Sequence, residues 1–276
     1  MGAGVLTLGL AACGDTAELV DGSEGDKAAE SDLTLEEVFT KSSEASEDIT
    51  SLHADMKTNQ LMDMGMEGME MEIVMDLAMD MTMEPLAFYQ VAKTTMVSDE
   101  AENMPPMEME MYLAEEGMFM FEPTMESWLK MPDADVAELE SLANQQVTDP
   151  AEQLEQLEAF QDDFAFEQNA DEYILTLDAA GEEFQELIDQ QLETTLGQME
   201  MEVAAPDMSV NSVSYEIFID KETFLPNAMN VVMDIDMEAE GESVSIKSDV
   251  QSKFSKYNEI EPITVPAEVV EQATAF

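Results

Sequence analysis

The chain has 276 residues and carries 64 aspartates and glutamates against nine lysines plus arginines, a formal net charge of −55. This charge, without any basic stripe, makes nucleic acids and anionic membrane surfaces poor partners. An acidic surface of this kind repels itself unless salt screens it, so the composition favours an extracytoplasmic protein from a saline or alkaline habitat. The single cysteine excludes an internal disulfide.

The first 13 residues combine a short apolar run with the only cysteine. The run is too short to span a bilayer. It ends in Leu10-Ala11-Ala12-Cys13, which resembles the lipobox of bacterial lipoprotein signals. The resemblance implies that residues 1–13 are signal peptide and lipobox, and that Cys13 carries a lipid that holds the protein on the extracytoplasmic face of the cell membrane. No lysine or arginine precedes the run, so we expect the basic start of the signal upstream of Met1.

Residues 14–32 are small, polar and acidic, which predicts a disordered tether between the anchor and the folded part. The folded part begins at Thr34, which together with Glu37 has the sequence signature of a capping box. A helix is therefore expected to end near Asp48. No further linker follows, so we predict that residues 33–276 form a single domain, and we expect a monomer.

The clearest pattern is the alternation of apolar and mostly acidic residues from Met69 to Met83. Methionine and glutamate are good helix formers, so propensity alone favours a helix. A helix would spread the methionines around its circumference, whereas a strand places them all on one face. We therefore predict a long strand in an antiparallel sheet with one apolar and one polar face. The apolar residues of this strand are Met69, Met71, Ile73, Met75, Leu77, Met79, Met81 and Met83.

The remaining elements, in chain order, alternate between hairpins and helices. Strands are expected at residues 52–64, 86–97, 107–113, 118–121, 125–131, 164–168, 172–177, 213–219, 228–240 and 243–257. Helices are expected at residues 133–146, from 149 onwards, and at 181–198, with a short helix near the C-terminus. This order predicts an α+β fold in which the helices gather on one face of an antiparallel sheet.

Three segments resemble the LolA/LppX-like lipoprotein superfamily. They are the hairpin of residues 112–131 with its Glu-Gly-Met-Phe-Met-Phe-Glu-Pro sequence, the Asp-Lys-Glu-Thr turn of residues 219–226, and residues 257–269. The similarity covers residues 34–270 and is closest to an uncharacterised family of Gram-positive (Bacillota) lipoproteins. It implies a half-barrel, a curved antiparallel sheet with helices on its concave face, and a lipid or lipoprotein carried between sheet and helices. It brings no catalytic motif.

Enzymatic and calcium-dependent functions find little support in the residues. His53, the only histidine, falls on the polar phase of its strand, and the chain has neither a G-x-S-x-G motif nor a glycine-rich phosphate loop. We therefore expect no catalysis and no cofactor. Residues 236–241 have the spacing of a calcium loop, but Lys247 occupies the position where a glutamate is needed, and the alternation predicts strand and turn instead.

Three functions remain open, two that bind a ligand and one that does not. The methionine face could line a space for a lipid or another hydrophobic ligand, because methionine adapts to irregular apolar shapes. Alternatively, the thioethers of Met62, Met64 and Met66 suit Cu(I), although a neighbouring strand or the segment of residues 65–68 would have to bring the sulfurs together. An envelope interaction scaffold with a solid core is the third alternative. Besides residues 69–81 of the long strand, the predicted lining residues are Met107, Met109, Met111, Met233 and Met237.

Overall fold

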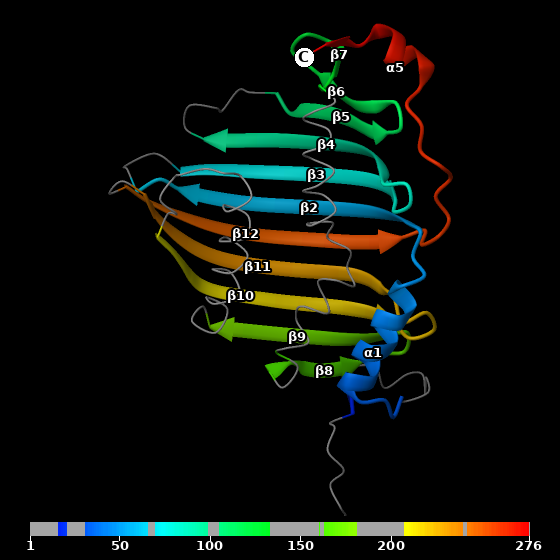
Figure 1. Ribbon diagram of the computed structural model, residues 1–276. Helices are drawn as coiled ribbons and strands as arrows, with labels where there is room; N and C mark the ends of the chain where they lie inside the picture. The colour runs from blue at the N-terminus through cyan, green and yellow to red at the C-terminus, as the bar shows by residue number, and fades with distance from the viewer. Residues whose placement is uncertain are drawn as a thin grey trace, which may run out of the picture.

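In a computed structural model of the chain, the described residues form one sheet of 13 strands with two helices (Figure 1). The structure describes residues 16–20, 31–65, 70–98, 105–132, 160, 163–180, 207–239 and 242–275. The helices predicted at residues 133–146, from 149 onwards and at 181–198 lie outside these ranges.

The strands follow one another across the sheet in the order β1-β8-β9-β10-β11-β12-β2-β3-β4-β5-β6-β7-β13. All neighbouring pairs are antiparallel except the two outermost, β1 with β8 and β13 with β7. The strands are β1 (Glu18–Leu19), β2 (Ser51–Asp63), β3 (Glu70–Thr82), β4 (Ala87–Ser98), β5 (Met107–Ala114), β6 (Gly117–Glu122), β7 (Ser127–Lys130), β8 (Ala165–Gln168), β9 (Glu172–Ala180), β10 (Asp207–Asp220), β11 (Pro226–Ala239), β12 (Glu242–Ser255) and β13 (Thr274–Ala275). This large, open, curved sheet fits the half-barrel that the resemblance implied.

The long strand predicted from the methionine alternation is β3, and its register confirms the two faces. Met75 lies opposite Thr58 of β2 and Thr94 of β4, so all three share one face. Its neighbour Asp76 lies opposite Lys57 and Lys93 and points to the other side. We call the side that carries the odd-numbered residues of β3 the apolar face, and the side that carries Asp76 the polar face.

Helix α1 (Leu35–Ser46) packs on the apolar face at the β8 end of the sheet (Figure 1). It begins as predicted: the Glu37 backbone N–H donates to Thr34 Oγ1 at 3.3 Å, and the Thr34 N–H donates to the Glu37 carboxylate at 2.9 Å. Its buried side chains join a core with buried residues of β9, β10 and β11. This core contains Val38, Phe39, Leu175, Leu177, Ile217, Ile219 and Met229.

Part of the predicted tether belongs to the fold. Residues 16–20 add strand β1 beside β8, and Ala17 is buried. The side chain of Gln168 donates to the carbonyl of Ala17 at 2.9 Å and accepts the Ser31 N–H at 3.0 Å. The expectation of a disordered tether over residues 14–32 is therefore wrong for residues 16–20 and 31–32, where a buried glutamine in β8 supplies the partners.

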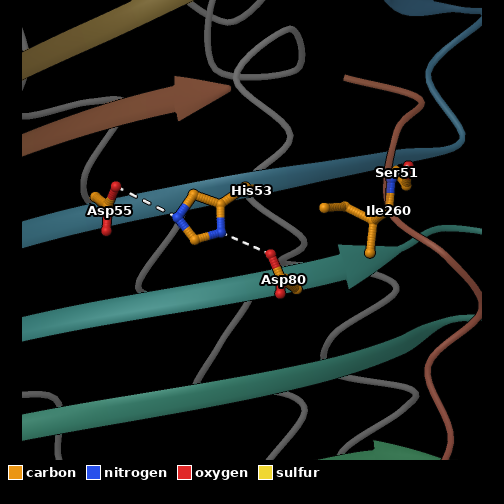
Figure 2. A network of polar contacts seen from close by, with 5 residues as sticks. All are labelled: Ser51, His53, Asp55, Asp80 and Ile260. Atoms are coloured by element: carbon orange, nitrogen blue, oxygen red, sulfur yellow. Dashed lines mark hydrogen bonds and ion pairs between the residues drawn. The ribbon is translucent and has the colours of Figure 1, made fainter. Parts of the chain in front are cut away.

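The C-terminal segment crosses to the opposite face at the opposite end of the sheet. It is fixed to the start of β2, where the N–H of Asn258 donates to the Ser51 carbonyl at 2.8 Å. The N–H of Ile260 donates to Ser51 Oγ at 3.1 Å, and Figure 2 shows these two residues side by side. Helix α5 (Ala267–Gln272) then buries Val269 against a cluster that includes Phe119 on the polar face. The two described helices thus lie on opposite faces, and helices covering the concave face are not confirmed.

Candidate functional site

The predicted lining residues lie together on the apolar face. Met69 is outside the described residues, and the other eleven belong to β3, β5 and β11. The strands between them carry further apolar side chains on the same face, none of which was predicted to line the ligand space. These are Met56 and Met62 of β2, Phe88 and Met96 of β4, and Ile246 and Val250 of β12.

This methionine-rich surface is less tightly buried than the core beneath α1. Leu175 and Ile217 in that core are 0% exposed. Of the eleven described lining residues, only Met81 is buried, at 6% exposure. Met107 is 38% exposed, and the others are half-buried. A well-packed interior leaves few gaps around its side chains, so partial exposure along several adjacent strands distinguishes this surface from a sealed core.

Polar groups interrupt the apolar face at separate points. Gln90 of β4 lies between Met79 of β3 and Met111 of β5 in the register, and its side-chain amide contacts the Met111 sulfur at 3.7 Å. Gln60 of β2 lies opposite Ile73 in the same way. An apolar surface with a few placed polar groups is the usual lining of a small-molecule site.

The methionines proposed for copper are only partly brought together. Met62 lies directly opposite Met71 of β3 on the apolar face, so the neighbouring strand does supply a second thioether at short range. Met64 follows the end of β2, and Met66 lies outside the described residues. Among the described histidine, cysteine, aspartate and glutamate residues, no group of three could hold a metal ion.

The polar face carries a groove of about 800 Å³. Its lining crosses the middle of the sheet, from Glu172 at the start of β9 to Glu108 on β5. Charged side chains of β2, β3 and β4 line it together with apolar ones such as Phe218 and Val91. The volume is in the range of small-molecule sites, roughly 300–1,000 Å³. From the sequence only a polar face was expected here, because the register across eight strands is what brings the groove residues together.

His53 lies on the polar face, as its phase predicted, but its ring is not simply solvated (Figure 2). Its Nδ1 lies 2.6 Å from Asp80 Oδ1 and its Nε2 3.3 Å from Asp55 Oδ2, and the side chain is 18% exposed. In the described part of the chain, the partners of both ring nitrogens are carboxylates, and the nearby Ser51 hydroxyl instead accepts the N–H of Ile260.

An aromatic row continues the polar face beside the groove. The rings of Tyr89 and Tyr112 stack with centroids 4.4 Å apart, and Tyr112 lies 5.7 Å from Trp128. Burial, and then the nearby Glu110 carboxylate, raise the pKa of Tyr89 well above the ordinary tyrosine value, and its hydroxyl donates to Glu110 at 3.1 Å. Because Tyr112 and Trp128 pack against the cluster that contains Val269 of α5, this row is structural at its outer end.

A family model matches residues 34–274, nearly the whole of the predicted domain. The chain belongs to a family of unknown function, DUF6612. No curated protein matches the chain. Within the described residues, no helix is both long and apolar enough to cross a membrane. The similarity to a family of Gram-positive lipoproteins, inferred from the sequence, stays a prediction.

Three solved structures are similar to the chain at low identity. LprF from Mycobacterium bovis is 12% identical, with 83% of this chain and 94% of that chain covered and a TM-score of 0.36. A DUF1329 family protein from Desulfovibrio piger is 9% identical, with coverages of 78% and 90% and a TM-score of 0.25. A β-barrel-like DUF1849 protein from Brucella abortus is 12% identical, with coverages of 75% and 99% and a TM-score of 0.21. These TM-scores are too low to support a conclusion about fold or function.

Proposed function

We propose that the protein is a non-catalytic, lipid-anchored component of the cell envelope that binds a lipid or another hydrophobic ligand on the apolar face of its sheet. The observation that carries this proposal is the row of half-buried methionines across β3 and β5, continued by β11. Large apolar surfaces that keep accessible area mark binding sites in soluble proteins. Methionine is suited to such a surface because its flexible thioether chain adapts to different apolar shapes.

The anchoring part of the proposal rests on Cys13 and the lipobox that precedes it. Cys13 lies only three residues before Thr16, where the described part of the chain starts at the β8 end of the sheet. A lipid on Cys13 would therefore hold this end of the sheet near the membrane. A hydrophobic ligand that leaves or enters a bilayer would then have a short path to the apolar face.

The absence of catalysis is part of the proposal. His53 is the only histidine, and carboxylates engage both of its ring nitrogens, which leaves it no position for activating a hydroxyl nucleophile. With 64 acidic residues in the chain, pairs of carboxylates occur without any catalytic meaning.

The test uses the whole chain with Cys13→Ser, because residues 16–20 belong to the fold and a shorter chain would lose β1. The purified protein is extracted with organic solvent and the extract examined by mass spectrometry, and a fluorescent fatty acid is titrated into the delipidated protein. We expect co-purified lipid and a dissociation constant for the probe in the micromolar range or tighter, which corresponds to about −8 kcal/mol.

Two variants and a matched control locate the binding surface. Met79→Asp and Met111→Asp place a carboxylate on the apolar face, and each should weaken probe binding at least about tenfold, since burying a charge against a lipid chain is costly. Met125→Asp makes the same change at a side chain that is 62% exposed in the turn before β7, and should leave binding unchanged. A folded protein, judged by circular dichroism, that binds neither lipid nor probe would refute the proposal.

Cu(I) binding is a second candidate function, because Met62 of β2 and Met71 of β3 lie directly opposite each other on adjacent strands. Cu(I) is titrated under reducing conditions in the same preparation. A copper site would be lost in Met62→Leu and Met71→Leu but kept in Met79→Leu. Leucine conserves the apolar volume, so lipid binding should survive in all three variants.

A further inference from the structure

The lysines of this very acidic chain fall into two groups, those whose ammonium group has a defined contact and those whose ammonium group has none among the described residues. Eight of the nine lie in the described residues, and four of these have a defined contact. Lys247 pairs with Asp234 at 3.2 Å, and the ammonium groups of three others lie over aromatic rings, Lys41 over Phe224, Lys130 over Phe119 and Lys221 over Tyr173.

The other four are Lys57, Lys93, Lys253 and Lys256. Within the described residues, their side chains make no hydrogen bond, ion pair or ring contact. Three of them, Lys57, Lys93 and Lys253, line the groove on the polar face. Three lysines whose ammonium groups have no partner among the described residues therefore line one hollow of a surface that is otherwise rich in carboxylates.

The register places the three lysines within reach of a common ligand. Lys57 of β2 and Lys93 of β4 flank β3, so their backbones are two strand spacings, about 9–10 Å, apart. Lys253 of β12 lies opposite Asp55, diagonal to Lys57 on the adjacent strand, at about 7–8 Å. The lysine stem is flexible, so all three ammonium groups can turn toward one anion between them.

Four carboxylates also line the groove, Asp55, Asp76, Glu108 and Glu172. Glu172 lies on β9, three strands away from Lys253 of β12, and accepts from the side-chain amides of Asn169 and Asn227 at 2.8 Å each. Asp55, which faces the His53 ring at 3.3 Å, Asp76 and Glu108 therefore balance the three lysines, so the groove is locally neutral on a strongly acidic surface. At physiological ionic strength charges are screened over about 8 Å, so the distant acidic residues contribute little at the groove.

We propose that this groove binds a soluble phosphate ester of a polyol, such as a sugar phosphate. The three ammonium groups would hold the phosphate, for which lysine is a common point-charge ligand. Asp76 and Glu108 would accept hydrogen bonds from hydroxyl groups, and the amide of Gln251, which also lines the groove, can donate or accept. Val91, Phe218 and Ala228 supply apolar contact for the carbon skeleton. The site is independent of the proposed lipid site, because it lies on the opposite face of the sheet.

Titration calorimetry with glucose 6-phosphate, inorganic phosphate and glucose, on the whole chain carrying Cys13→Ser in about 0.15 M salt, tests the inference. We expect glucose 6-phosphate to bind more tightly than either of the other two. Lys57→Gln and Lys93→Gln should each weaken it at least about tenfold. Lys256→Gln removes the same charge from a lysine that also lacks a partner but lies outside the groove, and binding should not change.

Three outcomes would overturn the inference. The first is a folded protein that does not bind glucose 6-phosphate. The second is equal weakening in Lys256→Gln and Lys57→Gln, which would mean a general effect of net charge. The third is binding of inorganic phosphate as tight as that of the ester, which would leave an anion site with no role for the polyol. Met79→Asp should leave the phosphate ester bound, so failure of the lipid proposal and failure of this one are distinguishable.

Discussion

Replacement of Ile217 by alanine should destabilise the protein far more than replacement of Val232, and the comparison tests the assignment of the two faces. Ile217 of β10 is 0% exposed on the apolar face, in the core that Val38 and Phe39 of α1 complete. Ile217→Ala removes three buried carbons at about 0.8 kcal/mol each, so about 2.4 kcal/mol is lost by transfer alone. The cavity left beneath the helix adds to this, and we expect a total of about 3–4 kcal/mol.

Val232 provides the matched control on the adjacent strand. It lies on the polar face of β11, opposite Ser214 of β10, and is 50% exposed. Val232→Ala removes two carbons that are half in water, so the cost should stay below about 1 kcal/mol. Urea unfolding followed by circular dichroism and by fluorescence of Trp128, the only tryptophan, gives both values. Equal losses of free energy of unfolding, with unchanged m-values, would mean that β10 and β11 are assigned to the wrong faces.

Two further predictions concern the anchor and the aromatic row. A fatty-acid probe fed to expressing cells should label the protein, and Cys13→Ala should abolish the label; a label that survives would remove the anchor from the proposed function. The raised pKa of Tyr89 means that the unfolded chain releases this proton first as the pH rises. Stability should therefore be fully present below the ordinary tyrosine pKa of about 10 and fall above it. Tyr89→Phe should reduce this alkaline loss in urea titrations between neutral and strongly alkaline pH, whereas an unchanged pH profile would contradict the assignment.

The sequence predicted the elements whose pattern is local. The alternation through Met75 and Asp76 predicted which residues of β3 share a face, and the pairing with both neighbours agrees, because a slip by one residue would turn its whole apolar set to the polar face. Thr34 and Glu37 defined the start of α1 because a capping box is complete within four residues. Asp236 lies in β11 and Lys247 in β12, as expected from the rejection of a calcium loop.

The groove and the strand formed by residues 16–20 could not be predicted, because both depend on contacts between residues that are far apart in the sequence. Residues 16–20 have no strand pattern, and they find their partners far along the chain, in the backbone of β8 and the side-chain amide of Gln168. Lys57 and Lys93 belong to different hairpins, and nothing in either segment shows that Asp76 will lie between them. The contacts of His53 have the same origin, since Asp80 reaches it only through the β2–β3 register.

The polar residues on the apolar face are the main reason to propose that it binds a ligand. A face that serves only as core gains nothing from an amide, because burying one without a partner costs free energy. Gln60 and Gln90 nevertheless lie among the methionines of β3 and β5, and both are half-buried. The side-chain amide of Gln90 contacts the sulfur of Met111, and sulfur is a weak acceptor. Amides that keep unused hydrogen-bonding capacity on a half-exposed apolar surface can bind the polar end of a lipid while the methionines contact its chain. This combination favours a ligand over a solid core.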